Sequence, residues 1–457
     1  MTTITQLSPA LDDFRGELIR PDDERYDAAR ALHNGMFDRH PALIARCADT
    51  GDVVAALRHA RAQGLPVAVR GGSHNGGGLA SVDDGVCIDL SAMRGVRVNP
   101  ADGTVDVQGG ALLGDVDHAT HAFGRALPSG IISTTGVGGI TLGGGIGHLS
   151  RSGGLTIDNL VGADVVLADG RVVRASAEQE PDLFWAIRGG GGNFGIVTSF
   201  TFRTLPVGNV YAGPMLWRPE RAEEIMRAWS EFLPQAPREL GGFFAFLIVP
   251  PVDPFPEALR MKPMCGVVWT YAGPPAMGDE ALAPMRALEP DLDGVAEVPL
   301  PAWNSAFDGL YPAGIQQYWR ADFIGELNDE AIAQHVEHGP TLPSVSSTMH
   351  LYPIDGAVHD VPVDGTAFAA RDVRFAMVIL GADGDPARAG ELRDWVTAYH
   401  EAVHPHAARG AYVNFMMEEG ADRVRDTYGP NYDRLRQVKR DYDPDNVFHV
   451  NQNIPPA

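Results

Sequence analysis

The sequence predicts an α+β fold made of a glycine-rich first region and a second region of different composition. Helix and strand patterns alternate between residues 52 and 124, as in an α/β unit. Glycine density then becomes extreme from Ser129 to Gly154. After Leu205-Pro206 proline becomes frequent, and aromatic strand patterns alternate with helical ones. A chain of 457 residues has room for two or three domains of roughly 150 residues, so we expect a domain boundary at residue 206.

Local signals predict the elements of the first region in order. Asp52 can cap a helix over residues 53–63, and Gly64 can close it. Asp169-Gly170 joins two strand-like runs over residues 165–173, which is a strong hairpin signal. Further strands are predicted at residues 67–69, 86–90, 105–107 and 198–204, and further helices at residues 111–123 and 181–187.

The second region mixes helices and strands. Residues 222–232 have a helical pattern, whereas residues 243–247 form an aromatic strand. Tyr318, His350 and Tyr352 lie in further strand-like runs. Tyr412 and Asn414 stand two residues apart in an alternating run, so we expect their side chains on the same face of a strand.

Composition excludes several classes of protein. The formal net charge is −23 and the pI is about 4.9, so the surface should repel nucleic acid. No run of about 18 apolar residues is present, so no membrane span is expected. Residues 1–20 carry acidic side chains and lack an apolar stretch, so no Sec signal is expected. The three cysteines have no paired spacing, and Cys47 and Cys87 lie in apolar runs, which fits a reducing, cytoplasmic setting.

One loop combines glycines with a single reactive side chain. A short apolar strand runs into Arg70-Gly71-Gly72-Ser73-His74-Asn75, and three more glycines follow. Glycine lets backbone N–H groups approach a phosphate closely. His74 is the one side chain in this loop that can act as a nucleophile. The loop therefore predicts a cofactor site in which a bond to the cofactor can form.

Six segments in this order resemble the FAD-linked oxidases of the vanillyl-alcohol oxidase and berberine-bridge-enzyme family. They are Gly16 to Ile19, Pro41 to Cys47, Arg70 to His74, Gly138 to Gly145, Asp182 to Gly195, and the tail with Tyr412 to Asn414 and Asp443 to Phe448. The resemblance implies a PCMH-type FAD-binding domain over residues 38–206. It also implies a substrate domain over residues 207–407, with an antiparallel sheet flanked by helices. Residues 408–457 would return to the FAD domain.

The resemblance also implies how FAD is held. The histidine of the Arg-x-Gly-x-His pattern, here His74, would be bonded to the 8α carbon of the flavin. Many relatives carry a second bond from a cysteine, but Ile132 occupies that position here. We therefore expect one covalent bond. The other residues expected to contact FAD are Arg70, Gly71, Gly72, Ser73, Asn75, Gly130, Thr134, Thr135, Gly138, Gly139, Gly143, Gly144, Gly145, Gly195, Val197, Tyr412 and Asn414.

The catalytic base is left open among four side chains: Tyr412, Tyr318, Tyr352 and His350. By resemblance, Thr135 lies where oxygen meets the reduced flavin, and Gly130 leaves a gap through which oxygen can pass. The expected activity is that of an oxidase. Hydride would leave a C–H next to oxygen or nitrogen of a small or secondary-metabolite substrate, and O2 would become hydrogen peroxide. The alternatives are a dehydrogenase with another electron acceptor and an oligosaccharide oxidase. A monomer or homodimer is expected.

Two other motifs point to different classes of protein. Gly190-x-Gly192-x-x-Gly195 matches a Rossmann fingerprint, but a helix precedes it and a strand follows, the reverse of the required order. His400-Glu401-Ala402-Val403-His404 matches the zinc pattern H-E-x-x-H. Pro405 ends that helix, and His406 is too close to serve as a third ligand. We therefore expect a solvated helix end and no metal.

Overall fold

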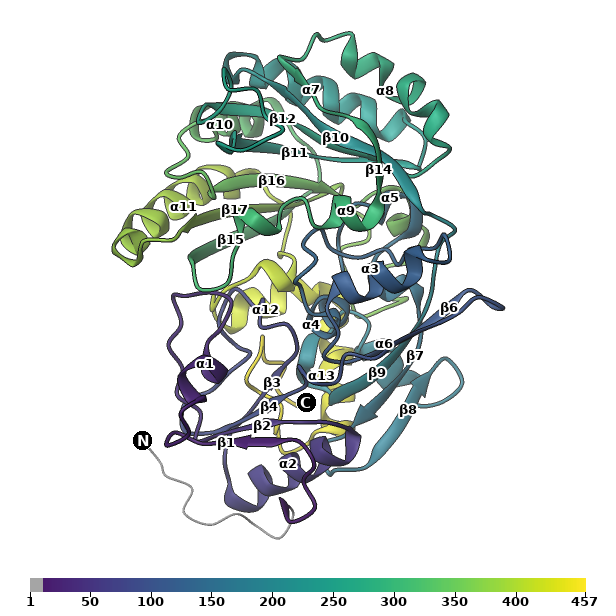
Figure 1. The fold of residues 1–457 in the computed structure, drawn as a ribbon, viewed down its shortest axis with the longest axis vertical. Helices are drawn as coiled ribbons and strands as arrows, with labels where there is room; N and C mark the ends of the chain where they lie inside the picture. The colour runs from purple at the N-terminus through teal and green to yellow at the C-terminus, as the bar shows by residue number, and fades with distance from the viewer. Residues whose placement is uncertain (1–10) are drawn as a thin grey trace.

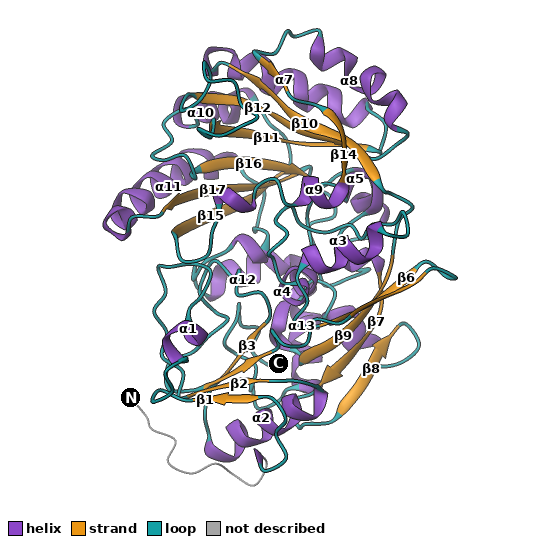
Figure 2. Ribbon diagram, in the orientation of Figure 1, coloured by secondary structure: helices purple, strands orange, loops and turns teal. Residues whose placement is uncertain are grey.

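The computed structural model describes residues 11–457 as two halves joined through a central layer of loops (Figure 1). Residues 1–10, half of the segment examined for a secretion signal, lie outside this range. The lower half contains most of the chain up to β9, which ends at Arg203, and both C-terminal helices, and the upper half contains a large sheet under a layer of helices (Figures 1 and 2).

A four-stranded sheet forms the base of the lower half. Its order is β1 (Glu17–Ile19), β2 (Leu43–Arg46), β4 (Val86–Asp89) and β3 (Val67–Arg70), with β1 antiparallel and the rest parallel. Helix α2 (Thr50–Gln63) packs against it and ends at Gly64, whose φ is 64°. The predicted cap is wrong, because Asp49 caps the helix. Asp52 instead accepts hydrogen bonds from the backbone N–H groups of Arg15, Gly16 and Ala48 at 2.8–2.9 Å.

An antiparallel five-stranded sheet completes the lower half. Its order is β5 (Val96–Asn99), β6 (Thr104–Gln108), β9 (Ile196–Arg203), β7 (Leu160–Val166) and β8 (Val172–Ser176). The predicted Asp-Gly hairpin is confirmed, since β7 and β8 pair up to Val166 and Val172. The short helices α3 (Leu113–His121), α4 (Val137–Gly143) and α6 (Pro181–Ala186) pack into the core of this sheet. Helix α1 (Tyr26–Arg30) packs on the four-stranded sheet, and α5 (Ser150–Gly153) contacts the upper half.

The upper half is an antiparallel sheet of eight strands. Along it lie β13 (Leu292–Asp293), β10 (Asn209–Trp217), β12 (Pro263–Tyr271), β11 (Leu240–Ile248), β16 (Thr348–Pro353), β17 (Phe375–Asp383) and β15 (Gln316–Ile324), and β14 (Ala296–Pro299) pairs with β10. Helices α7 (Ala222–Phe232), α8 (Gly278–Arg286), α10 (Asp329–His338) and α11 (Ala389–Val403) cover one face. The short α9 (Leu300–Asn304) lies near the other half (Figure 2).

Strand alternation divides the apolar side chains of this sheet between two cores. Phe244 and Phe246 of β11 pack under the helices, whereas Phe243 and Ala245 face the lower half. This is the period of two expected of a strand buried on both faces. The face that meets the lower half is the one available to line a site between the two halves.

The C-terminal tail returns to the lower half. Helices α12 (Ala421–Tyr428) and α13 (Tyr432–Tyr442) pack into the core around the five-stranded sheet. The buried Lys439 ammonium donates to Asn193 O at 2.8 Å, Phe448 O at 2.9 Å and Asp443 Oδ2 at 2.6 Å. These contacts support the division that we propose at residues 206 and 407. Among residues 11–457, no helix has both the length and the apolar character needed to cross a bilayer.

A buried carboxyl group where α3 meets α9 predicts a pH-dependent stability. Burial raises the pKa of Asp117 to about 7, although a hydrogen bond from Asn304 Nδ2 at 2.9 Å lowers it. The unfolded chain loses this proton near pH 4, so the folded state is destabilised relative to it as pH rises from about 4 to 7. The Tm of Asp117→Asn should therefore equal that of wild type at pH 4 and be higher than that of wild type at pH 8. An equal Tm at pH 8 would contradict the assigned shift.

Candidate active site

A cavity of about 310 Å³ lies between the two halves. The lower half contributes glycine-rich loops, and the upper half contributes side chains from β15, β16 and β17. Most of the predicted site residues line it: Gly71, Gly72, Ser73, His74, Asn75, Gly130, Thr135, Gly138, Gly139, Gly195, Val197, His350, Tyr352, Tyr412 and Asn414.

The glycine loops approach each other so closely that side chains would not fit. A Cβ on Gly72 would lie 2.3 Å from Gly136 N, whereas a Cβ on Gly139 would meet nothing within 4 Å. Ser73 adopts a φ of 61°, a conformation that glycine reaches more easily. Any residue larger than glycine at position 72 would require the two loops to separate.

The lower wall fits an extended phosphate-bearing cofactor. Gly191, Gly192 and Gly195 line it beside the Tyr428 phenol. The hydroxyl of Tyr428 is buried and has no hydrogen-bond partner among the described residues. A buried polar atom without a partner is the state expected of a group that meets a bound molecule.

His74 projects into the cavity as a neutral imidazole. Its Nε2 lies 3.0 Å from Thr134 Oγ1, and its ring stacks on His33 with centroids 3.7 Å apart. Burial, with a smaller effect from His33, lowers the pKa of His74 to about 3. The ring therefore keeps a free lone pair near neutral pH, as a nucleophile requires.

Tyr412 and Asn414 meet in the cavity, but on a different backbone from the one predicted. The segment is a turn of 3₁₀ helix over Val413–Phe415 and not a strand. Tyr412 Oη accepts hydrogen bonds from Asn414 Nδ2 at 2.8 Å and from Gly145 N at 2.9 Å. Burial raises the pKa of Tyr412 to about 12, and these two donors oppose the rise because they favour the phenolate.

Two of the other three candidate bases lie together on β16. His350 Nδ1 is 2.8 Å from Tyr352 Oη. Burial lowers the pKa of His350 to about 3 and raises that of Tyr352 well above its usual value. Both side chains therefore stay neutral, and one hydrogen bond joins the phenol to the imidazole.

The prediction that Tyr318 lines this cavity is wrong. Gln317 and Trp319 of β15 face the cavity, so the alternation of the strand turns Tyr318 to the opposite face. There Tyr318 packs against the core under the helices, with the Arg393 guanidinium 5.5 Å from the centre of its ring.

Several predicted cofactor contacts support the wall of the cavity without lining it. The Arg70 guanidinium binds the backbone oxygens of Ala29, Arg30 and Ala80, because its side chain is buried beneath the loop. Gly143 leaves room for the Asn414 amide, and Gly144 for Phe368 and Tyr412. Gly145 donates its N–H to Tyr412, and Thr134 reaches His74 from outside the lining. These residues lie next to the cavity, and their contact with FAD stays a prediction.

The FAD binding domain model matches residues 41–176, and the berberine and berberine-like model matches residues 411–455. An uncharacterized FAD-linked oxidoreductase of Bacillus subtilis, YgaK, is 32% identical over 96% of this chain and 97% of its own. The chain belongs to this family of FAD-linked oxidoreductases. The (R)-6-hydroxynicotine oxidase of Paenarthrobacter nicotinovorans is 30% identical over 97% of both chains. The structure of 6-hydroxy-D-nicotine oxidase from Arthrobacter nicotinovorans covers both chains fully, with a TM-score of 0.87 and 27% identity.

Sequence reasoning missed four side chains of this FAD-linked oxidoreductase. His33, Tyr311, Gln317 and Trp319 line the cavity. His33 Nδ1 lies 3.2 Å from Gln317 Nε2, so two segments separated by 284 residues meet behind His74. Alternation in the run that contains Tyr318 places Gln317 and Trp319 together on the opposite face, but it does not say which face meets the cavity. Nothing in the sequence around His33 or Tyr311 indicates a place in the site.

Proposed function

We propose that this FAD-linked oxidoreductase is an oxidase of small neutral molecules that passes electrons to O2 and forms hydrogen peroxide. The observation that carries the proposal is the cavity itself, with His74 and the glycine loops on one wall and Tyr412, His350 and Tyr352 on the others. FAD, when bound, accepts a hydride from a substrate C–H next to oxygen or nitrogen.

His74 would hold the flavin by one bond to the 8α carbon. Thr134 contacts Nε2, so Nδ1 is the ring nitrogen we assign to this bond. Ile132 lines the cavity where relatives place a second attachment. The three cysteines are buried and none lines the cavity: Cys47 directly follows β2, Cys87 lies on β4, and Cys265 lies on β12 beside Trp217 of β10.

Tyr412 is the base that we favour for the substrate proton. Its oxygen already accepts two N–H donors, which prepares it to carry negative charge. The His350–Tyr352 pair is less suited to this role, because burial keeps the Tyr352 phenol protonated and its oxygen is hydrogen-bonded to a neutral imidazole. We assign that pair to substrate orientation through the Tyr352 hydroxyl.

The charge of the lining indicates the class of substrate. Among residues 11–457, those that line the cavity include no Asp, Glu, Lys or Arg. A charged substrate would lose its hydration there without gaining an ionic partner. Alcohols and other uncharged molecules therefore fit best, and an amine would enter in its unprotonated form. Below the pKa of the free amine, kcat/KM should therefore rise more steeply with pH for an amine than for an alcohol, because the amine must also lose its own proton.

The proposed passage for oxygen beside Gly130 needs a correction. A Cβ on Gly130 would lie 2.5 Å from Ile140 Cδ1 and 3.3 Å from Leu113 Cδ1. The space left by the missing side chain is therefore filled already, and a larger residue there would displace Ile140.

Stopped-flow mixing of the reduced enzyme with O2 tests the oxidase proposal directly. Reoxidation too slow to sustain turnover would show that another acceptor is used.

A cysteine at position 132 should restore a second bond. Ile132 lines the cavity, so the thiol of Ile132→Cys would face the bound flavin. We expect the double variant His74→Ala, Ile132→Cys to keep its flavin after denaturation. Ser133→Cys in the same background should release it, because Ser133 lies outside the lining and its hydroxyl is hydrogen-bonded to Asp308. Release from both would mean that position 132 does not correspond to the second attachment site.

A further inference from the structure

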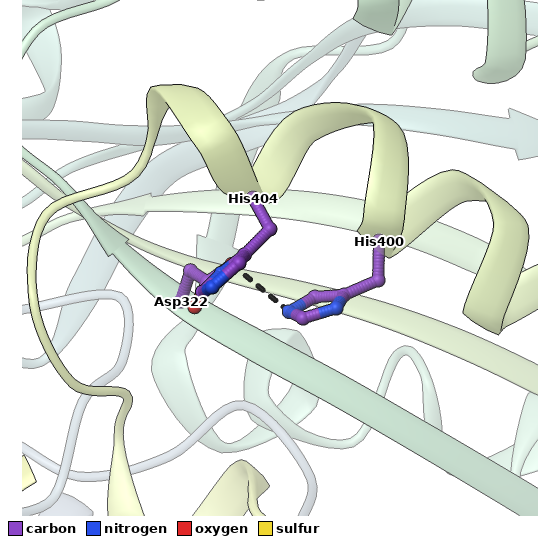
Figure 3. Close-up of side chains that lie close together, drawn as sticks. All are labelled: Asp322, His400 and His404. Atoms are coloured by element: carbon purple, nitrogen blue, oxygen red, sulfur yellow. Dashed lines mark hydrogen bonds and ion pairs between the residues drawn. The ribbon is translucent and has the colours of Figure 1, made fainter. Parts of the chain in front are cut away.

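The two histidines of the H-E-x-x-H segment converge on a buried carboxylate from the large sheet. His400 lies in the last turn of α11, and His404 begins the following 3₁₀ turn (His404–His406). Figure 3 shows both rings directed toward Asp322, which comes from β15. The sequence offers no third ligand near the histidines, because Asp322 precedes His400 by 78 positions and is brought there by the fold.

The three ligand atoms are close together. Asp322 Oδ2 lies 2.9 Å from His400 Nε2 and 2.9 Å from His404 Nδ1, and all three atoms lie within 4.8 Å of one another. The expected solvated helix end is wrong for His400, whose side chain is 14% exposed, and Asp322 is fully buried. His400 Nε2 has no hydrogen-bond partner of good geometry among the described residues, although it is buried against the carboxylate.

The carboxylate is held so that one oxygen faces the histidines. Arg423 Nη2 donates to Asp322 Oδ1, and also to Ala321 O at 2.7 Å. Glu419 lies 3.6 Å from Arg423 Nε, so the arginine charge is shared between two carboxylates. The Arg423 guanidinium thus holds one oxygen of the carboxylate and leaves Oδ2 to face both imidazoles.

We propose that Asp322, His400 and His404 bind one divalent transition-metal ion, for which Zn²⁺ is the best match. Two imidazoles and one carboxylate are a ligand set that zinc accepts, with bonds of about 2.0–2.2 Å. Such bonds place tetrahedral ligand atoms about 3.3 Å apart, so each pair now at 2.9 Å need only open by about 0.4 Å. His404 is half exposed, which gives the ion a route from solvent and leaves water to complete its coordination.

The ion would stabilise the fold and not take part in the flavin reaction. Asp322 lies on the face of β15 that turns away from the cavity, opposite Gln317 and Trp319. An ion bound by these three residues would link the end of α11 to β15, just before the chain passes into the C-terminal tail. Through Arg423 the same carboxylate also contacts α12.

Zinc titration of the full chain with flavin bound tests the site. We would remove any purification tag, treat the protein with a chelator, and measure binding by calorimetry at pH 7.5, because zinc binding weakens as pH falls. Wild type should bind one Zn²⁺ per chain, and a hundredfold excess over Kd should raise Tm by about 2–5 °C. His400→Ala and His404→Ala should each weaken binding at least tenfold and remove the Tm shift.

His406→Ala is the matched control. His406 lies in the same 3₁₀ turn as His404 and is outside the ligand set, so its loss should leave zinc affinity unchanged. His404→Gln, which keeps a polar side chain of similar length, replaces the alanine variant if that one does not fold. No binding by wild type overturns the proposal. Equal binding by wild type and both ligand variants overturns it too, since zinc would then occupy another site.

Discussion

His74→Ala should abolish covalent attachment of the flavin. Wild-type protein precipitated with acid should keep its yellow colour, and the pellet of the variant should be colourless. The physical reason is that His74 is the neutral nucleophile in the cavity lining whose Nε2 is already held by Thr134, which leaves Nδ1 for the bond. Absorbance of the pellet and the intact mass of the chain both measure the result.

Two controls separate loss of the bond from loss of the site. Ser73→Gly should keep the covalent flavin, because glycine adopts the φ of 61° found at Ser73 without strain. His118→Ala changes an exposed histidine on α3 and should behave as wild type. A flavin still bonded in His74→Ala would contradict the assignment of His74 as the attachment site. A flavin-bearing peptide from any other part of the chain would contradict it too.

The fold was largely predictable because its signals are local. The helix over Ala222–Phe232 has the predicted bounds, and the Asp169-Gly170 hairpin forms as its turn chemistry requires. The predicted cap at Asp52 was wrong because the contacts of this side chain are long-range and cannot be read from the local sequence. Asp52 is a good capping residue, but the N–H groups of residues 15 and 16 lie next to it only in the folded chain.

The site was predictable where one loop carries the chemistry and unpredictable where distant segments meet. The glycine loop with His74 could be identified from a dozen residues, because close approach of the backbone restricts the sequence there. His33 could not, since its place behind His74 depends on β15, almost 300 residues away. The contact of Asp322 with His400 and His404 could not be predicted for the same reason, because the three residues are far apart in sequence and meet only in the fold. Tyr318 was misplaced although its strand was predicted, because periodicity gives the two faces of a strand but not which one is inside.

Tyr412→Phe should slow reduction of the flavin by substrate by about 10²–10⁴-fold, the usual contribution of a general base. The variant keeps the ring and removes only the oxygen that accepts hydrogen bonds from Gly145 and Asn414. Tyr399→Phe is the control, since Tyr399 is also a buried tyrosine with a hydrogen-bonded hydroxyl but lies on the far face of the sheet, bonded to His335. Anaerobic stopped-flow mixing with an alcohol substrate measures the rate of flavin reduction in wild type and in both variants.

The pH profile distinguishes a base from a residue that only shapes the cavity. Because the pKa of Tyr412 is raised to about 12, its phenolate fraction grows about tenfold per pH unit across the range in which the protein is handled. Reduction by an uncharged substrate should therefore accelerate between pH 7 and 9.5 in wild type and stay flat in Tyr412→Phe. If the variant reduces its flavin at the wild-type rate, the base lies elsewhere, and the Tyr352–His350 pair is the next to test. A slowed variant that keeps the wild-type slope would mean that Tyr412 positions the substrate and another group takes its proton.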